Sequence, residues 1–236
     1  MAGGGFGRKR NFRRSPGTNT AREADQKQTV QTESGGDQDL DLLEGSSFAS
    51  AVNEGERNFS SATIQSSELS SIECQGLNLS DSSISDLSVN DADLQSSDFS
   101  NAELINCVFD DVNLKLCKFD NCAAASMKVR NADLTRCEFS EADLSHSVFL
   151  DVDLSQARFE NADLSFSEFN DASLKGVCFK NADLSNAKFI NVAFEDTDFS
   201  DAAIGGVSFE DCVGKVRWEG RSIDYAELVQ ISKDQL

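Results

Sequence analysis

Carboxylates, thiols and one histidine are the groups in this chain that could do chemistry. The sequence has 41 Asp and Glu residues, seven Cys and a single His, His146. Carboxylates act as general acids and bases where burial or a neighbouring charge shifts their pKa, and Cys with His can bind zinc or act as a nucleophile. Two sets of acids recur at multiples of twenty residues, namely Asp143, Asp163, Asp183 and Asp111, Asp151, Asp171, Asp211.

None of these groups belongs to a motif of a catalytic or metal centre. The sequence lacks zinc-ligand spacing, a nucleophile elbow, a phosphate-binding loop and a dinucleotide fingerprint. We therefore predict no catalytic residue, no metal, no cofactor and no small-molecule substrate. The regular spacing of the acids indicates columns on a convex surface, with no cleft to shift their pKa values.

A five-residue repeat is the element that must position the acids. Every fifth residue from Phe59 to Phe209 is apolar, without an insertion, which makes 31 consecutive units. Two residues before each of them lies a second, mostly small residue, in the series from Ala62 to Val207. A period of five fits neither an α-helix nor a flat strand. The chain must turn a corner every five residues and return one large and one small side chain to a shared core.

The repeated words make this chain resemble the pentapeptide-repeat proteins. Ala-Asp-Leu-Ser occurs at 142–145, 162–165 and 182–185, with close variants at 92–95, 132–135 and 152–155. The resemblance implies an all-β fold, a right-handed quadrilateral parallel β-helix with four pentads per coil and coils joined by backbone hydrogen bonds.

With four pentads per coil, residue n lies next to residue n+20, and the core has two Leu walls and two Phe walls. One Phe column runs from Phe99 to Phe199 and the facing one from Phe109 to Phe209. The stretch Cys122–Val129 departs from the pattern, because Ala124 takes a large position while Met127 takes a small one. It predicts either local repacking or a bulge.

The cysteines fit the inward positions of the repeat. Cys178 alone is expected to face outward, and we interpret the others as small buried hydrophobes. Cys117 and Cys137 lie one coil apart, close enough for a disulfide. An odd number of Cys without metal spacing favours a reducing compartment, the cytoplasm. No apolar run approaches the ~20 residues of a membrane span.

The flanks of the repeat suggest four segments. We predict a disordered basic and polar tail (1–36), an N-terminal cap (37–56), the β-helix (57–213) and a C-terminal cap with a short helix (214–236). Met1–Arg22 contains six basic residues and no acid. This arm could contact nucleic acid, the ribosome or an acidic partner, serve as an organellar transit peptide, or be solvated only. Organellar location is thus the alternative to the cytoplasm.

The C-terminal segment contains a predicted helix from Asp224 to Ile231, in which Asp224 and Glu227 have capping-box spacing. The candidate contact residues here are Trp218, Tyr225, Leu228 and Val229. They either cap the last coil or join two chains into a homodimer, as C-terminal helices do in some members of the family that this chain resembles.

The surface of the repeat is strongly acidic. Residues 57–213 contain 28 Asp and Glu and 10 Lys and Arg, a net charge of −18. The column Asn101, Asn121, Asn161 and Asn181 can hydrogen-bond from coil to coil, whereas the Asp columns have no such pairing and repel each other. These columns either keep the protein soluble or bind a partner. The outward apolar residues Val148, Leu150 and Ile190, with Phe166 near another corner, would mark a contact if they cluster.

Two functions remain open. The first is a non-catalytic scaffold whose rigid acidic rod docks a protein partner. The second is a DNA-mimicking inhibitor or protector of a type II topoisomerase (DNA gyrase), as resemblance to the quinolone-resistance branch of the family implies. The net charge per unit length of the predicted β-helix approaches that of duplex DNA. Neither function involves DNA binding by the rod or contact with a membrane.

Overall fold

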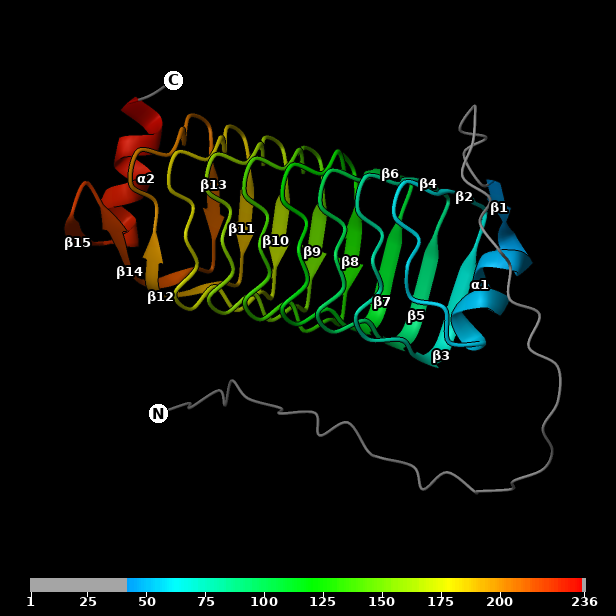
Figure 1. The fold of residues 1–236 in the computed structure, drawn as a ribbon. Helices are drawn as coiled ribbons and strands as arrows, with labels where there is room; N and C mark the ends of the chain where they lie inside the picture. The colour runs from blue at the N-terminus through cyan, green and yellow to red at the C-terminus, as the bar shows by residue number, and fades with distance from the viewer. Residues whose placement is uncertain (1–41, 235–236) are drawn as a thin grey trace, which may run out of the picture. The chain divides into compact units, whose positions relative to one another are not determined.

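Backbone hydrogen bonds between residues about twenty apart build the structure. A computed structural model describes residues 42–234, which form a mostly parallel β-solenoid of about nine turns with a short helix at its C-terminal end (Figure 1). Asp133 pairs in parallel with both Asn113 and Asp153, and the amide of Leu134 donates to the carbonyl of Asp153 at 2.8 Å. The predicted fold class is confirmed, and residues n and n+20 are neighbours.

One side of the solenoid has a parallel sheet only in its first coils. The sheet has the order β1-β2-β4-β6. Its strands are β1 (Leu42–Glu44), β2 (Thr63–Gln65), β4 (Ser83–Ser85) and β6 (Glu103–Ile105). After β6 the same side continues through isolated parallel bridges at Ala123, Asp143, Asp163, Asp183 and Ala203.

The next side has strands along most of its length. This eight-stranded sheet has the order β13-β11-β10-β9-β8-β7-β5-β3 (Figure 1). Its strands are β3 (Glu68–Glu73), β5 (Ser88–Asp93), β7 (Val108–Asn113), β8 (Lys128–Arg130), β9 (Val148–Leu150), β10 (Glu168–Asn170), β11 (Lys188–Ile190) and β13 (Ser208–Glu210). The stretch 122–129 therefore contains no bulge, since Lys128 and Val129 keep the register of β7 and β9.

Each corner of a coil is a residue with left-handed backbone. One residue in five, from Ser61 to Asp211, has φ between 50° and 73°. Asn, Asp, Ser and Gly occupy most of these positions, since Gly, Asn and Asp tolerate this conformation best. Because the chain turns at one left-handed residue in every five, the sequence repeats with a period of five.

The core consists of stacked columns of large side chains. Phe139 and Phe159 stack at a ring distance of 4.7 Å and an interplanar angle of 2°. Phe159 meets Phe169 of the facing column edge-on at 6.4 Å and 86°. Such stacked and edge-to-face pairs add to the hydrophobic stabilisation of the core. The predicted Phe walls are confirmed.

Several buried hydroxyls and thiols at the small inward positions donate to carbonyls of the coil before them. Thr197 Oγ1 donates to the carbonyl of Leu174 at 2.8 Å, and Cys137 Sγ to that of Leu114 at 3.0 Å. Cys117 Sγ makes the equivalent bond to Leu94 at 3.1 Å. All seven thiols are free, and only Cys178 is not buried. Cys therefore acts here as a small apolar residue with a weak donor.

The N-terminal end of the solenoid is closed by α1 (Gly45–Asn53). Phe48 and Val52 are buried, and the ring of Phe48 meets that of Phe59 edge-on at 4.9 Å. Leu42, which lies in the segment predicted to form this cap, is exposed, because it lies in β1 on the outward side of the strand. Residues 37–41 of that segment lie outside the described residues.

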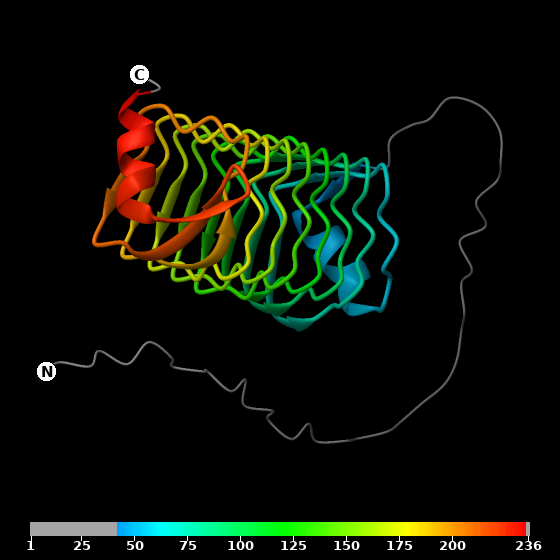
Figure 2. The ribbon, with the colours of Figure 1, turned by 90° about the vertical axis from the view of Figure 1, so that its left-hand side faces the viewer.

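The C-terminal end is closed by a small sheet and a helix, which lies across the last coil (Figure 2). Its elements are β12 (Ala193–Asp198), β14 (Val213–Trp218), β15 (Arg221–Asp224) and α2 (Tyr225–Asp234). Asp224 caps α2 by accepting the amide of Ala226 at 3.0 Å. Gly214 is required where β14 passes β12, because a Cβ there would lie 2.1 Å from the carbonyl oxygen of Phe194.

Candidate functional site

The first acidic column, Asp143, Asp163 and Asp183, lies on the side of β1, β2, β4 and β6, one residue per coil. Each carboxylate accepts the amide of the residue two positions later, at 3.0 Å for Ser145, 2.9 Å for Ser165 and 2.9 Å for Ser185. We expected these acids to lack coil-to-coil pairing, and the bonds that they make lie within their own coil. They stabilise turns, as Asx side chains do.

The second acidic column occupies a corner. Asp111, Asp151, Asp171 and Asp211 have φ between 51° and 55°, a conformation that Asp tolerates better than most residues. Asn191 donates its amide to Asp171 in the preceding coil. This column therefore also has a structural role that the sequence analysis did not assign.

The side with Asp143 is distinguished by what it lacks. With its two bounding corners it comprises residues 61–66, 81–86, 101–106, 121–126, 141–146, 161–166, 181–186 and 201–206, which we call the acidic side. It has no Lys or Arg in any of these eight coils. Its eight carboxylates are Asp81, Asp86, Glu103, Glu141, Asp143, Asp163, Asp183 and Asp201. All ten basic residues of the repeat lie on the other three sides.

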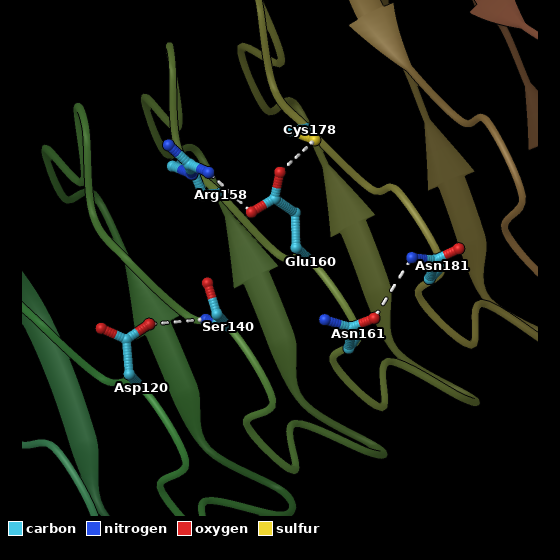
Figure 3. Close-up of polar contacts among 7 residues, drawn as sticks. All are labelled: Asp120, Ser140, Arg158, Glu160, Asn161, Cys178 and Asn181. Carbon is cyan, nitrogen blue, oxygen red and sulfur yellow. Dashed lines mark hydrogen bonds and ion pairs between the residues drawn. The ribbon is translucent and has the colours of Figure 1, made fainter.

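The side that precedes the acidic side along each coil has a different charge pattern. This paired side comprises residues 57–60, 77–80, 97–100, 117–120, 137–140, 157–160, 177–180 and 197–200, with five acids and four basic residues. Arg158 contacts Glu160 at 2.7 Å, and Cys178 Sγ donates to the same carboxylate at 3.5 Å (Figure 3). The hydrogen bond from Arg158 lowers the pKa of Glu160. Among residues 42–234, the ion pairs are Arg158–Glu160, Lys175–Glu195 and Arg217–Asp198, none of them on the acidic side.

An open hollow interrupts the acidic side where the sheet β1-β2-β4-β6 ends. Its volume is about 320 Å³. The lining residues are Glu103, Leu104, Ile105, Asn106, Ala123, Ala125, Ser126 and Asp143. Ala123 stands where the next three coils have a turn-bridging Asp, and its methyl group leaves the space beside it open. Ile105 borders the hollow and is 45% exposed.

Two stacked rings lie further along the corner that contains Asn106 and Ser126 of the hollow. His146 and Phe166 are parallel, with 5.0 Å between ring centroids, as the predicted position one coil apart requires. Phe166 is 54% exposed. Both residues have left-handed backbone, with φ of 60° and 58°. For bulky residues this conformation costs on the order of 1 kcal/mol each, and the other coils use Ser66, Asp86, Asn106, Ser126, Asn186 or Gly206 at this corner. Neither burial nor turn geometry explains Phe166.

The thiols do not form a reactive centre. Burial raises the pKa of Cys117 and Cys122 to about 12 and that of Cys107 to about 11, which disfavours the thiolate that acts as nucleophile and metal ligand. Within residues 42–234, no group of three His, Cys, Asp or Glu side chains is arranged to hold a metal.

The remaining predicted contact residues do not form one surface. Val148, Leu150 and Ile190 are half-buried on the eight-stranded sheet, where Asn170 separates the last two. One rung of the Asn ladder forms, from Asn181 to Asn161 at 3.2 Å (Figure 3), whereas Asn101 bonds to Asp81.

At the C-terminal end, Trp218 and Leu228 are buried, and Tyr225 packs against the core. Val229 is half-buried. Homodimerisation through α2 stays a prediction. The basic arm and the tail 1–36 lie outside the described residues.

Neither helix in the described part of the chain combines the length and the hydrophobicity needed to cross a membrane.

Three family models match the chain: pentapeptide repeats (8 copies) at residues 90–123, pentapeptide repeat region at 112–189 and pentapeptide repeats (9 copies) at 169–213. None of the curated proteins matches it.

Several solved structures are similar to the chain. A pentapeptide repeat protein from the thylakoid lumen of Arabidopsis thaliana is 26% identical over 38% of this chain and 63% of that one, with a TM-score of 0.37. This chain therefore spans less than two thirds of that protein. HetL, which is involved in heterocyst differentiation regulation in Nostoc sp. strain PCC 7120, is 18% identical over 72% and 92%, with a TM-score of 0.30. QnrB1, a plasmid-mediated fluoroquinolone resistance protein, is 17% identical over 84% and 97%, with a TM-score of 0.31.

Proposed function

Because the chain belongs to the pentapeptide-repeat family, we propose that it is a non-catalytic interaction protein whose acidic side docks the basic surface of a protein partner. The single observation that carries this proposal is the absence of Lys and Arg from the acidic side over eight coils.

The distribution of charge favours binding over solubility as the reason for the acids. Solubility requires net charge, which the other three sides of the repeat already supply. Concentrating carboxylates about 4.8 Å apart in one column adds repulsion between like charges. A partner with a complementary basic surface relieves this repulsion and associates faster because of the long-range field.

The same distribution bears on the topoisomerase alternative. A DNA duplex is charged around its whole circumference, whereas the paired side has nearly balanced charges, with five acids and four basic residues. A surface whose charge differs this much between two of its sides suits a partner that binds one side better than one that encloses a cylinder. A supercoiling assay with DNA gyrase tests the alternative, and inhibition or protection at micromolar protein would favour it.

Matched variants separate the acidic side from acidity in general. Asp163→Asn with Asp183→Asn removes two charges from the acidic side. Asp133→Asn with Asp153→Asn removes two charges from another side, at the same position of the pentad. Asp133 and Asp153 also accept turn amides, those of Thr135 and Ser155, both at 2.9 Å, so the two pairs have equal structural roles.

The experiment is affinity capture from a lysate, with quantitative mass spectrometry of what wild type and each variant retain. We expect a partner that the Asp133/Asp153 variant retains and the Asp163/Asp183 variant loses, in a salt-dependent manner. Equal recovery of every protein by both variants would contradict the proposal.

A further inference from the structure

The exposed ring of Phe166 and the hollow beside Ile105 are two features of the acidic side that its charge does not explain. His146 covers one face of the Phe166 ring at 5.0 Å. On the other side the next corner residue is Asn186, which has a shorter side chain. Within residues 42–234, His146 is the one ring stacked on Phe166, and Phe166 is 54% exposed, so part of its ring is accessible to a partner.

We propose that these features select an arginine-containing segment of a protein partner, in which an arginine stacks on Phe166 and an aliphatic side chain enters the hollow beside Ile105. This inference rests on the proposed function, because it assumes that the acidic side binds a basic protein surface.

Charge complementarity identifies the occupant as basic. Asp163 lies in the same coil as Phe166, and Asp183 in the next one, while no Lys or Arg lies on this side. A nucleic acid or an anionic membrane would be repelled. A cationic side chain over Phe166 gains both the aromatic face and the nearby carboxylates.

The shape of the platform favours arginine over lysine. A guanidinium group is planar and weakly hydrated, and it stacks flat on an aromatic ring while its edge donates to carboxylates. An ammonium group is a strongly hydrated point charge, which gains less from an open ring face. Arginine can therefore be distinguished from lysine at equal charge.

The distance between the two features fits a short segment. The hollow lies between the coils of Ile105 and Ser126, which are three and two coils before Phe166. Two to three coils correspond to about 10–14 Å, which an extended chain spans in about three to four residues. Ile105 and the alanines of the hollow offer apolar surface for the neighbouring aliphatic side chain.

The test uses two labelled peptides of the same length and charge, one with arginines and one with lysines, each containing one leucine. Fluorescence anisotropy gives their Kd values for the full chain. We expect wild type to bind the arginine peptide about fivefold to tenfold more tightly than the lysine peptide.

Two substitutions form a matched pair. Phe166→Asn should abolish the preference for arginine and bring the ratio of the Kd values close to one. Leu116→Asn, at another corner with φ of 61° and 42% exposure, should leave the preference unchanged. Since Asn suits left-handed backbone, the melting temperature of Phe166→Asn should equal or exceed that of wild type, which excludes misfolding as the cause.

Ile105→Ser tests the hollow. It should weaken binding of the leucine-containing arginine peptide about threefold, with no effect on an arginine peptide that has alanine in place of leucine. Equal losses for both peptides would overturn the assignment of the aliphatic side chain to the hollow.

The outcomes separate this inference from the proposed function. If both peptides bind equally well and Asp163→Asn with Asp183→Asn weakens both, the acidic side binds basic segments and the arginine selection is wrong. If neither peptide binds, or the Asp variant changes nothing, the proposed function fails as well. An arginine preference that persists in Phe166→Asn would also overturn the inference.

Discussion

The paired side and the acidic side have the same backbone conformation but differ in whether their carboxylates have basic partners. Both consist of pentads with left-handed corners, and both cover a column of buried side chains, mostly Phe on the paired side and aliphatic on the acidic side. On the paired side, Arg158 and Glu160 neutralise each other. On the acidic side, every carboxylate is left without a cation on its own side. The comparison shows that the repeat fixes where surface residues stand but leaves their charge free, so one side can differ from another without a change of fold.

Thiol labelling should show the largest difference between the two sides. Cys178 is partly exposed on the paired side, whereas Cys122 is buried at the acidic side, with a pKa of about 12. With Ellman's reagent, Cys178 should react in the native protein, and the buried thiols should react at least about a thousandfold more slowly, because they need local unfolding. Rapid labelling of Cys122 without denaturant would contradict the closed core.

Alanine substitutions in the core beneath each side should have the next largest effect. Phe159→Ala, under the paired side, should cost about 3–5 kcal/mol, and Leu164→Ala, under the acidic side, about 2–5 kcal/mol. Both side chains are completely buried. Denaturant unfolding measures both. A cost below ~1 kcal/mol for Leu164→Ala would show that the acidic side is loosely supported, and the comparison of equal scaffolds would fail.

The turn carboxylates should have intermediate effects that separate charge from hydrogen bonding. Asp163→Ala with Asp183→Ala should cost up to about 1 kcal/mol per residue, because two turn amides lose their acceptor. Asp163→Asn with Asp183→Asn keeps an acceptor oxygen and reduces repulsion, so stability should be equal or slightly higher. Chemical unfolding of both double variants decides this. Equal destabilisation by Ala and Asn would show that the negative charge itself stabilises the turns.

The ion pair of the paired side should have the smallest effect. Because the folded pKa of Glu160 is lowered, its contribution is complete above the unfolded pKa of about 4.3 and is lost as the pH falls through the lower folded value. Arg158→Met should therefore cost less than ~1 kcal/mol at pH 7 and nothing at pH 2. An NMR titration should find the pKa of Glu160 raised in this variant. A cost that persists at pH 2 would mean that the Arg158 stem, not its charge, stabilises the fold.

Much of the fold could be predicted from the sequence because the period of five constrains every inward residue. The stacked rings of Phe139 and Phe159, the stack of His146 on Phe166 and the outward position of Cys178 all follow from a coil of twenty residues. The turn role of Asp163 does not follow from spacing, since it depends on which way the side chain points once the corner forms. The five-residue pattern does not indicate the orientation of an outward side chain.

The candidate site was only partly visible in the sequence. Sorting the residues by their position within twenty would have revealed the side without Lys or Arg, because this needs no coordinates. The hollow is different. It depends on the end of the sheet at β6 and on the small Ala123 in the next coil, and a change from strand to isolated bridge leaves the five-residue period intact.

The continuous register has one further consequence, for the evolution of such a protein. Because each coil adds about 4.8 Å and contacts only its neighbours, deletion or duplication of twenty residues changes the separation of two surface features in fixed steps. A duplication between Ser126 and His146 would move Ile105 away from Phe166 by one step while leaving both environments intact. The length of the solenoid can therefore change in equal steps by genetic recombination, while the caps at its two ends stay the same.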